Sequence, residues 1–389
     1  MGFNNMLKVD LADKGWESFE ERDPFNPTNV VKGYIYKKEG AFYGSLYIEE
    51  INNIPSKQFI RGVPKFNYPF DKAGNWNFPP TKYINIYMKA DGSVIFAYEI
   101  KFKDRRYVSY KTRLQPFLKN GKFNNFLDLW KEMLERYPDI PEMILQTNVN
   151  LAFELCGYRN PHLIEYPFDL DAFFIFGIDR NTSELLDHEE VQWHKSNRFP
   201  NKAPFEGQLK KGDDFQKRYK EIQYLKEQKL KLNEATNLYR GEEGSMLYCH
   251  TVDDRVVVLK LKPETIEKIH WASGDIDKNS IRATIMNAFE SWDEPNHDNV
   301  IALLAEEYSD RQIARMKDII EKELDLAIKH KVFVSEVLGR FIGAFAGISY
   351  NDLNKRVVMG YLSKFYVKSE MNKVYNALKE GGIPFDNGY

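Results

Sequence analysis

A few lysine and glutamate residues of this chain occupy positions where they could carry out chemistry rather than cover a surface. Lys89 lies in a run of alternating apolar and polar residues, 81–101, that an Asp91-Gly92 pair interrupts. This pattern predicts a β-hairpin in which Lys89 ends the first strand, on the face opposite the apolar side chains. A lysine held on a rigid strand can act as a nucleophile when its amine is neutral, whereas a free lysine, with a pKa of about 10.4, is mostly charged.

Two further lysines follow in a strand-like segment, RVVVLKLK. Lys260 and Lys262 are two residues apart, so a strand would project both side chains onto one face and into one cleft. Neighbouring cations lower the pKa of a lysine nucleophile, and they stabilise a phosphate group and its leaving group. The alternative is an ordinary solvated face of an alternating strand.

Two carboxylates stand out by their surroundings. Glu154 interrupts an apolar strand candidate, NVNLAFELCGY, where a carboxylate is unfavourable unless it has a partner such as a structural salt bridge. Glu243 lies in a glycine turn, GEEGS, directly after Glu242. It could coordinate Mg²⁺, orient a lysine amine, or be an ordinary surface acid.

The segment DLDAFFIFGIDR adds a run of aromatic rings, of which Phe174 or Phe176 could stack on a planar ligand; packing in the core is the alternative. Cys156 and Cys249 are the only cysteines, and the Cys and His residues show no metal-ligand spacing. A metal ion in this protein should therefore be a hard cation held by phosphates and carboxylates.

The elements that would position these residues change character along the chain. Residues from about 30 to 110 are rich in β-branched and aromatic residues broken by turns, which is typical of strands. Apolar residues at helical spacing predict helices over Lys122–Met143 and Leu209–Glu234. Beyond about residue 264 the pattern is helical throughout. We therefore predict an α+β protein with a domain of antiparallel sheets and flanking helices, 1–264, followed by an all-helical domain, 265–389.

Composition limits the function classes. At 389 residues the chain exceeds the size at which one hydrophobic core stops growing, which favours two domains. Its 55 Lys and Arg against 57 Asp and Glu give a net charge of −2, so no global basicity indicates a polyanion partner. Two cysteines fit a reducing compartment, and no apolar run is long enough to cross a membrane. We expect a cytoplasmic protein without a membrane partner.

The order of these residues resembles a known superfamily. Lys89-Ala90-Asp91-Gly92 is followed by Lys111, by Glu154 in its apolar strand candidate, and by the aromatic run Phe173–Phe176. Next come Glu243 in its glycine turn and the lysine pair, Lys260 and Lys262. This series is similar to motifs I, Ia, III, IIIa, IV and V of the covalent nucleotidyltransferases, the ATP-dependent ligases and capping enzymes. The resemblance implies an ATP-grasp-like nucleotidyltransferase domain for residues 1–264.

Three stretches look like one branch, the bacteriophage RNA ligase 1 family: FIRGVPKFNYPFD before Lys89, FELCGYRNPHLIEY around Glu154, and the terminal IPFDNGY after a helical domain. Two features differ from DNA ligases and capping enzymes, since position 94 is valine rather than arginine and the tail lacks the strands of an OB-fold. Where the family has an Arg-Gly pair, this chain has Lys32-Gly33, which could hold a triphosphate only as a point charge.

The resemblance assigns roles to individual residues. Lys89 would be the nucleophile, assisted by Lys260, Lys262 and Glu243, with Glu243 also the candidate magnesium ligand. The resemblance further implies ATP contacts by Lys65 with a phosphate, Lys111 as the motif Ia lysine, Glu154 with the ribose, and Phe174 or Phe176 stacked on the adenine. Lys89, Glu243, Lys260 and Lys262 would also bind ATP.

The implied function is ATP- and Mg²⁺-dependent joining of RNA 5′-phosphate and 3′-hydroxyl ends, for instance in cleaved tRNA, through lysyl-AMP and RNA-adenylate. The helical domain, 265–389, would supply RNA specificity. We expect a monomer, in the cytoplasm of an infected host if a phage encodes it. The alternatives are a ligase for nicked duplexes, including nicked DNA, and a non-catalytic RNA-binding relative.

Overall fold

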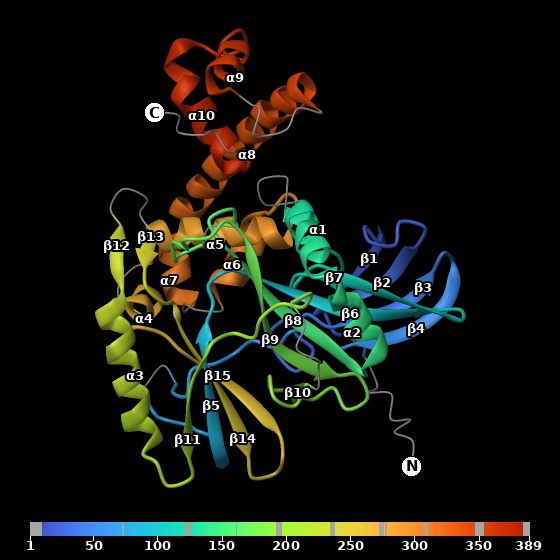
Figure 1. The fold of residues 1–389 in the computed structure, drawn as a ribbon, viewed down its shortest axis with the longest axis vertical. Helices are drawn as coiled ribbons and strands as arrows, with labels where there is room; N and C mark the ends of the chain where they lie inside the picture. Colours follow the sequence, from blue (N-terminus) through green and yellow to red (C-terminus); the bar gives the residue numbers. More distant parts are fainter. Residues whose placement is uncertain are drawn as a thin grey trace. The chain divides into compact units, whose positions relative to one another are not determined.

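A computed structural model of the chain describes residues 10–71, 74–120, 126–160, 162–191, 197–233, 238–271, 276, 278–305, 308, 310–346 and 354–383. The chain divides into two compact units, Met1–Leu118 with Trp130–Ala272, and Lys119–Leu129 with Ser273–Tyr389. The first contains the sheets and the second is helical (Figure 1). This confirms the predicted α+β class of antiparallel sheets with flanking helices and a helical C-terminal region.

Three antiparallel sheets build the first unit. One has the order β1-β2-β3-β4, with β1 (Trp16–Arg22), β2 (Val30–Tyr36), β3 (Leu46–Ile51) and β4 (Ile54–Ile60). A second has the order β10-β9-β8-β6-β7, with β10 (Leu185–Leu186), β9 (Asp171–Asp179), β8 (Val149–Cys156), β6 (Ser93–Phe102) and β7 (Arg105–Lys111). The third has the order β11-β5-β14-β15, with β11 (Phe205–Lys210), β5 (Thr81–Lys89), β14 (Gly244–Thr251) and β15 (Val256–Leu261). A two-stranded ribbon joins β12 (Lys231–Asn233) to β13 (Leu238–Arg240).

The predicted β-hairpin around Lys89 is wrong in one respect. Both strands form, as β5 and β6, but β5 pairs with β11 and β14 while β6 pairs with β7 and β8. The Asp91-Gly92 connection therefore carries the chain from one sheet to another instead of folding it back. Local alternation predicted the strands correctly, but their partners are set by contacts between distant segments, which a local pattern does not contain.

The alternation along β5 separates two cores. Ile84 and Ile86 pack with Tyr219 of helix α3 (Phe215–Lys229) in one cluster, whereas Tyr87 belongs to the core shared with the other two sheets. Successive residues of a strand face opposite sides. Lys89 therefore ends the strand on the Tyr87 side, opposite the isoleucines, as the sequence predicts.

The helices of the first unit differ from the predicted ranges at their ends. The predicted helix Lys122–Met143 is two helices, α1 (Phe126–Arg136) and α2 (Asp139–Gln146), with Pro138 as the N-cap of α2; residues 122–125 lie outside the described part. In Leu209–Glu234, α3 starts only after Asp214, whose side chain accepts a hydrogen bond from the Lys217 N–H at 3.0 Å and caps the helix.

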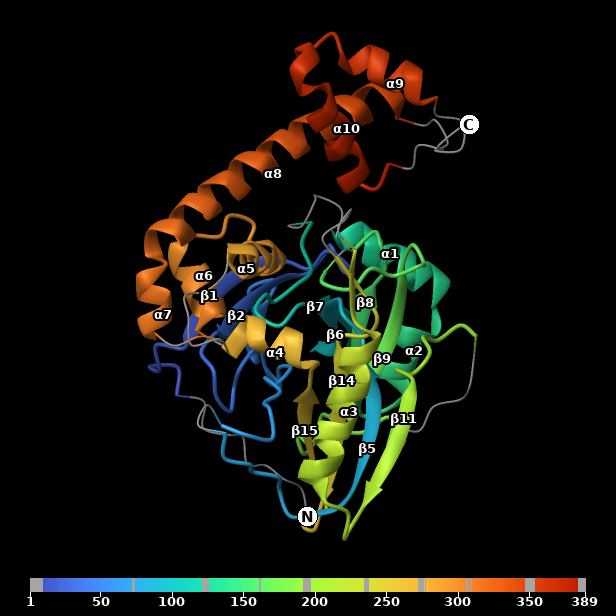
Figure 2. The same ribbon diagram turned by 90° about the vertical axis from the view of Figure 1, so that its left-hand side faces the viewer.

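The second unit is organised along one long helix, α8 (Lys317–Phe345), with smaller helices packed at its two ends (Figure 2). Its other elements are α5 (Lys278–Ser291), α6 (His297–Leu304), α7 (Asp310–Arg315), α9 (Lys355–Leu362), a 3₁₀ helix (Lys368–Glu370) and α10 (Met371–Glu380). Helix α4 (Glu264–Trp271) belongs to the first unit, so the units divide after it, whereas the sequence places the domain boundary at 264/265. Within the described residues, no helix has both the length and the apolar character needed to cross a membrane.

Candidate active site

The end of β5 and the start of β14 bring Lys89 and Glu243 together. Lys89 pairs in register with Gly244, which places the preceding residue, Glu243, beside the lysine side chain. The Lys89 Nζ donates a hydrogen bond to Glu243 Oε2, and the Lys262 Nζ lies 3.0 Å from Glu243 Oε1. The Glu243 carboxylate therefore contacts two lysines, Lys89 and Lys262, that lie 173 positions apart in the sequence.

The Glu243 carboxylate is buried, with a side chain only 6% exposed. Burial alone would raise its pKa, but the Lys89 and Lys262 ammonium groups outweigh this effect and lower the pKa to about 2. Glu243 is thus a permanent anion at neutral pH. Lys89 is more exposed, at 22% of its side chain, so the candidate nucleophile is the accessible member of this group.

Lys260 and Lys262 are not a solvated strand face. Both are largely buried, at 9% and 8% exposure. The Lys260 Nζ lies 4.5 Å from the ring centroid of Tyr68, a cation–π distance, and its backbone N–H donates to the Asn67 carbonyl at 2.9 Å. The segment that resembles the RNA ligase 1 stretch before Lys89 therefore packs directly on the lysine strand.

The residues after Lys89 do more than make a turn. The Asp91 carboxylate accepts hydrogen bonds from the Leu163 and Ile164 N–H groups, each at 2.6 Å. The Asp91 N–H donates to the Tyr166 hydroxyl at 2.7 Å. A Cβ on Gly92 would lie 2.1 Å from the Leu155 carbonyl oxygen, so only glycine fits there. These contacts lock the Lys89 turn against β8 and the segment that follows it.

Ser93 extends this lock. Asn160 donates one hydrogen bond to the Ser93 Oγ at 3.1 Å and another to the Leu155 carbonyl at 2.8 Å. The His162 Nε2 lies 3.1 Å from the same Oγ. From the sequence alone, the stretch after Glu154 shows a family resemblance but no physical role. The structure gives it a physical role, which is to hold the nucleophile turn.

Glu154 lies on β8, where it pairs with Val94 of β6 and with Phe173 of β9. Glu154 is 7% exposed, and the next residue, Leu155, pairs with Ser93 of β6. The strand order thus places Glu154 beside the turn that follows Lys89, as a residue of the same site would require.

The aromatic strand is irregular at this point. β9 has a bulge, so that Phe176 pairs with Ala152 but Phe174 pairs with Phe153. Phe174 and Phe176 are both fully buried, and the stacking prediction for either ring remains untested. Phe173 is only partly buried and is the direct cross-strand neighbour of Glu154. Its partial exposure and its pairing with Glu154 make Phe173 the better candidate for a ligand contact.

Lys111 is fully buried at the end of β7. Its Nζ donates to the carbonyls of Gly44, Thr112 and Arg113 at 3.0, 2.7 and 2.8 Å. Burial lowers its pKa to about 7. Three carbonyls match the three N–H donors of an ammonium group, which explains how a cation is accommodated there. Lys111 ties loops together, and its predicted contact with a nucleotide is untested.

Two other predicted phosphate-binding positions are more exposed. The Lys65 Nζ lies 3.0 Å from Glu39 Oε2, and Lys65 lines a cavity of about 350 Å³ together with Arg61 and Arg255. Lys32 lies 3.9 Å from Glu20, and about half of its side chain is exposed. Lys65 thus lines a cavity, whereas the Lys32 side chain is exposed on β2.

A second charged network supports the start of β14, and the sequence did not predict it. Lys226 of α3 is 5% exposed and donates hydrogen bonds to Glu206 of β11 and to Glu242. The Ser245 hydroxyl donates to Glu206 at 2.6 Å, and Lys229 lies 3.2 Å from Glu242. Burial would raise the pKa of Glu242, but the two lysines lower it overall. Glu242 is therefore a structural anion, which separates it from Glu243.

A buried polar cluster also lies along the Lys89 face of β5. The Asp187 carboxylate, which is fully buried, accepts from the Asn85 side chain at 2.8 Å and lies 2.8 Å from His250 Nε2. Burial opposes its charge, but hydrogen bonds from His250 and Asn85 and the nearby His188 ring hold the pKa of Asp187 well below its usual range. The Tyr87 ring stacks on His188 at 3.9 Å. This cluster fixes the strand that ends in Lys89.

Glu243 is the carboxylate predicted to contact a hard cation. Among the residues that the structure describes, no three His, Cys, Asp or Glu side chains form a group that could hold a metal ion. This donor set fits an ion that is completed by the phosphate oxygens of a bound nucleotide.

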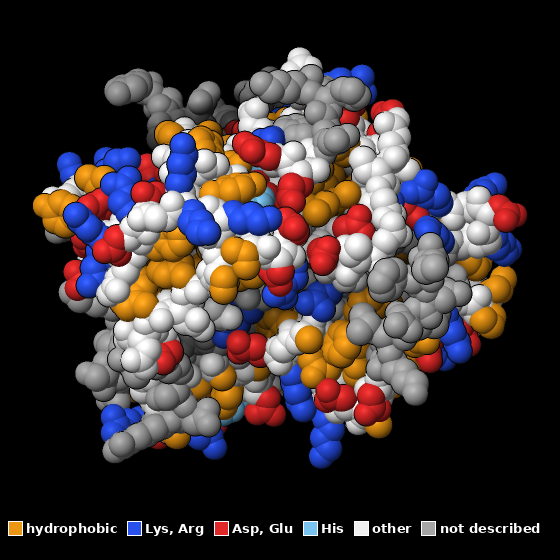
Figure 3. All heavy atoms as spheres, turned by 90° about the horizontal axis from the view of Figure 1, so that it is seen from below, with side chains coloured by type: hydrophobic (Ala, Val, Ile, Leu, Met, Phe, Trp, Pro, Cys, Tyr) orange, Lys and Arg blue, Asp and Glu red, His pale blue; other side chains and the backbone are white. Residues whose placement is uncertain are grey.

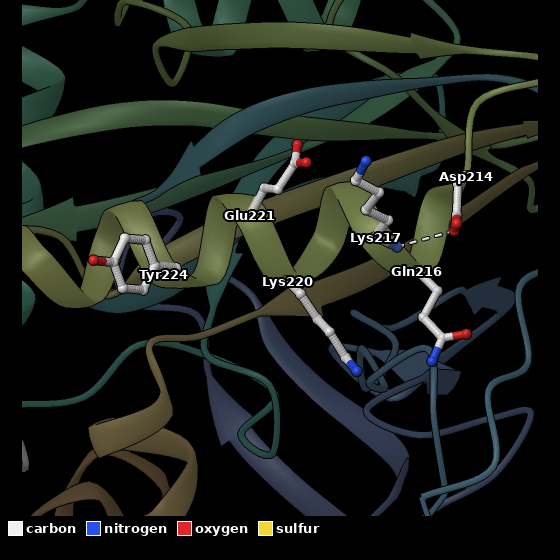
Figure 4. A pocket seen from close by; sticks show the side chains of 6 residues that line it. All are labelled: Asp214, Gln216, Lys217, Lys220, Glu221 and Tyr224. Carbon is white, nitrogen blue, oxygen red and sulfur yellow. Dashed lines mark hydrogen bonds between the residues drawn. The ribbon is translucent and has the colours of Figure 1, made fainter.

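Surface charges elsewhere are mixed in sign. On the face drawn in Figure 3, Lys and Arg side chains are interspersed with Asp and Glu. A shallow pocket along α3 is lined by Asp214, Gln216, Lys217, Lys220, Glu221 and Tyr224. In Figure 4, Lys217 and Glu221 point to one side of the helix and Lys220 to the other. The lysines of α3 that line this pocket therefore do not form a uniform basic face.

The chain was compared with known proteins. No family model and no curated protein matches it. Among solved structures, an archaeal ATP-dependent RNA ligase (form 2) has a TM-score of 0.47 and 14% identity, covering 96% of this chain and 94% of its own. A putative ATP-dependent DNA ligase from Aquifex aeolicus has a TM-score of 0.39 and 15% identity, covering 85% and 79%. A Naegleria gruberi RNA ligase with PPi has a TM-score of 0.34 and 15% identity, covering 49% and 52%. Likenesses this distant do not establish a family, and membership in the bacteriophage RNA ligase 1 family stays a prediction.

Proposed function

We propose that this protein is an ATP-dependent RNA ligase of the covalent nucleotidyltransferase type. The observation that carries the proposal is the Lys89–Glu243–Lys262 group, in which an accessible lysine shares a buried carboxylate with a second lysine. These residues come from motifs I, IV and V of the sequence resemblance. Their meeting at one point in space is the arrangement that lysyl-AMP chemistry would need.

In the first step, the neutral Lys89 amine attacks the α-phosphorus of ATP, a P–N bond forms, and the P–O bond to pyrophosphate breaks. Glu243 keeps the Lys89 side chain in place before the attack, since it accepts a hydrogen bond from Nζ. Lys260 near the end of β15 and Lys262 directly after it would stabilise the negative charge on the phosphates. Mg²⁺, held by phosphate oxygens and by Glu243, would neutralise further charge in this step.

The second step uses the same lysine as the leaving group, and in the third step AMP is the leaving group. An RNA 5′-phosphate oxygen attacks the lysyl-AMP phosphorus, which forms RNA-adenylate and returns the Lys89 amine. The RNA 3′-hydroxyl then attacks the 5′-phosphate, forms the phosphodiester and releases AMP. Splitting one difficult displacement into covalent stages is the usual benefit of a lysine nucleophile.

The remaining residues would hold the nucleotide. Glu154, 7% exposed beside the Lys89 turn, would accept a hydrogen bond from a ribose hydroxyl. Phe173 would contact the base, and Lys65, at its cavity, would contact a phosphate. The helical domain would supply RNA specificity, for instance for cleaved tRNA. We propose that the protein works as a monomer in the cytoplasm, of an infected host if a phage encodes it.

The experiment that tests the ligase branch offers purified, adenylylated protein three substrates in parallel. These are 5′-phosphorylated single-stranded RNA, nicked duplex RNA and nicked duplex DNA, each with a 3′-hydroxyl end. We expect sealing of the single-stranded RNA at the highest rate. Efficient sealing of only nicked DNA would refute the RNA assignment, and stable RNA binding without any AMP transfer would indicate a non-catalytic relative.

A further inference from the structure

The C-terminal end of the helical unit carries an excess of cations. Residues 354–383 contain six cations, and the carboxylates between them are only Glu370 and Glu380, although the whole chain has a net charge of −2. The six are Lys355, Arg356, Lys364, Lys368, Lys373 and Lys379. We call these six residues the α9–α10 cationic surface.

These cations are exposed and have no acidic partner among the residues that the structure describes. All six residues are exposed, and none of them forms an ion pair with a carboxylate in the part of the chain that the structure describes. Glu380 instead lies 2.7 Å from His330, and Glu370 accepts from the Val367 N–H at 3.2 Å. Two lysines of α8 differ from them, since Lys317 pairs with Glu321 and Lys329 pairs with Asp325.

Aromatic rings lie among the cations. The Lys355 Nζ lies 4.0 Å from the ring centroid of Tyr375, and the Lys379 Nζ lies 5.1 Å from it. A hydrogen bond with Lys355 and the charge of Lys379 lower the pKa of Tyr375. Lys364 lies 5.7 Å from the Tyr361 centroid. A partly exposed ring with cations beside it can stack on a base while the cations meet phosphates.

A separate core fixes this surface in place. Val358 and Leu362 of α9 pack with Val374 and Leu378 of α10 against Val337 of α8, and all five are fully buried. Buried side chains recur on α10 at positions 374, 377 and 378, so Lys373, Tyr375 and Lys379 occupy the remaining sides of the helix. The cations are thus displayed on packed helices rather than on a loose tail.

We propose that the α9–α10 cationic surface binds the phosphate backbone of single-stranded RNA, with Tyr375 stacking on a base between Lys355 and Lys379. This inference rests on the proposed function, because it takes the nucleic acid to be the ligase substrate. Unpaired cations attract a polyanion through counterion release, and the rings accept bases of any sequence. The surface therefore supplies affinity for the strand rather than recognition of one sequence.

The test measures binding of a 5′-phosphorylated single-stranded RNA to the full-length protein by fluorescence anisotropy at several salt concentrations. The variant is Lys355→Gln with Lys379→Gln, and a second variant is Tyr375→Leu. Lys317→Gln with Lys329→Gln is the matched control, because it removes two exposed lysines of the same unit that already have acidic partners. Circular dichroism checks that each variant keeps its helix content.

We expect the Lys355/Lys379 variant to bind about tenfold more weakly at low salt. Its plot of log affinity against log salt should be less steep by about 1.4, since each lost phosphate contact on a single strand removes about 0.7. Tyr375→Leu should weaken binding with the salt slope unchanged, and the control should match the wild type. An unchanged slope in the first variant, or an equal loss in the control, overturns the proposal.

Two parallel measurements separate this inference from others. Vesicles of anionic lipid are offered in place of RNA, and lysine-dependent binding to vesicles but not to RNA would assign the surface to a membrane instead. Lysyl-AMP formation by the wild-type protein is measured with radiolabelled ATP. Absence of label with lysine-dependent RNA binding intact would contradict the proposed function and leave the RNA-binding surface standing.

Discussion

The Lys89 site and the α9–α10 cationic surface use the same residue type in opposite ways. At the Lys89 site, Lys89 and Lys262 share the Glu243 carboxylate, and Lys260 lies over the Tyr68 ring. On the cationic surface, six exposed cations have no carboxylate partner among the described residues. Buried charges need partners, and the partners fix their geometry. Exposed charges without partners remain available to a polyanion, so the first region suits chemistry and the second suits binding.

The largest effect should come from removing the shared anion. We predict that Glu243→Gln reduces the rate of lysyl-AMP formation about a thousandfold, because Lys89 and Lys262 lose the charge that orders them. The rate is measured by single-turnover labelling with radiolabelled ATP. Glu242→Gln is the matched control on the neighbouring residue, and it should reduce the rate far less. Equal losses in both variants would show that position 243 has no special role.

The next effect concerns the network beneath β14. We predict that Lys226→Met lowers the free energy of unfolding by about 3 kcal/mol, because Glu206 and Glu242 are then left without their buried cation. Lys229→Met should cost less than about 0.5 kcal/mol, since Lys229 is 62% exposed and contacts the same Glu242. Urea denaturation measures both values. Lys226→Arg keeps the positive charge at this position. If Lys226→Arg loses as much stability as Lys226→Met, the charge of Lys226 is not what stabilises the protein.

Lys111 offers a test that distinguishes structure from ligand binding. Removing its ammonium group in Lys111→Met leaves the carbonyls of Gly44, Thr112 and Arg113 without a donor, which should cost about 2 kcal/mol. Thermal unfolding without ATP measures this cost. A variant with wild-type stability but weakened ATP binding would instead support the nucleotide contact that the sequence resemblance implies.

The smallest effect is a dependence of stability on acid. The pKa of Glu243 is about 2 in the folded protein against an ordinary value of 4.5, so the unfolded chain binds the proton first as the pH falls. Its contribution to stability is complete above pH 4.5 and is lost as the pH falls toward 2. At pH 3.5 the loss should be about 1 kcal/mol relative to neutral pH. Urea titrations at several pH values test this, and Glu243→Gln should lack this component.

Part of this account could be read from the sequence. Alternation predicted the strands and the face of Lys89, whereas only the fold shows that Lys262 contacts Glu243 and that Lys260 lies over the Tyr68 ring. The pairing of β5 and β6 could not be read locally, because their partners come from distant segments. The β9 bulge, which separates the faces of Phe174 and Phe176, is set by packing across the sheet and leaves no local signal. Lys226 looked like one of many helix lysines, and only the fold reveals its two acidic partners.

The most direct test of the central claim is covalent labelling of the protein with α-labelled ATP and Mg²⁺, followed by denaturing electrophoresis. Lys89→Ala is compared with Lys82→Ala, which removes a lysine of the same strand whose side chain is 44% exposed. The account predicts acid-labile label on the wild type and on Lys82→Ala, and none on folded Lys89→Ala. Label that persists on Lys89→Ala, or a wild-type protein that never acquires label, would contradict the account.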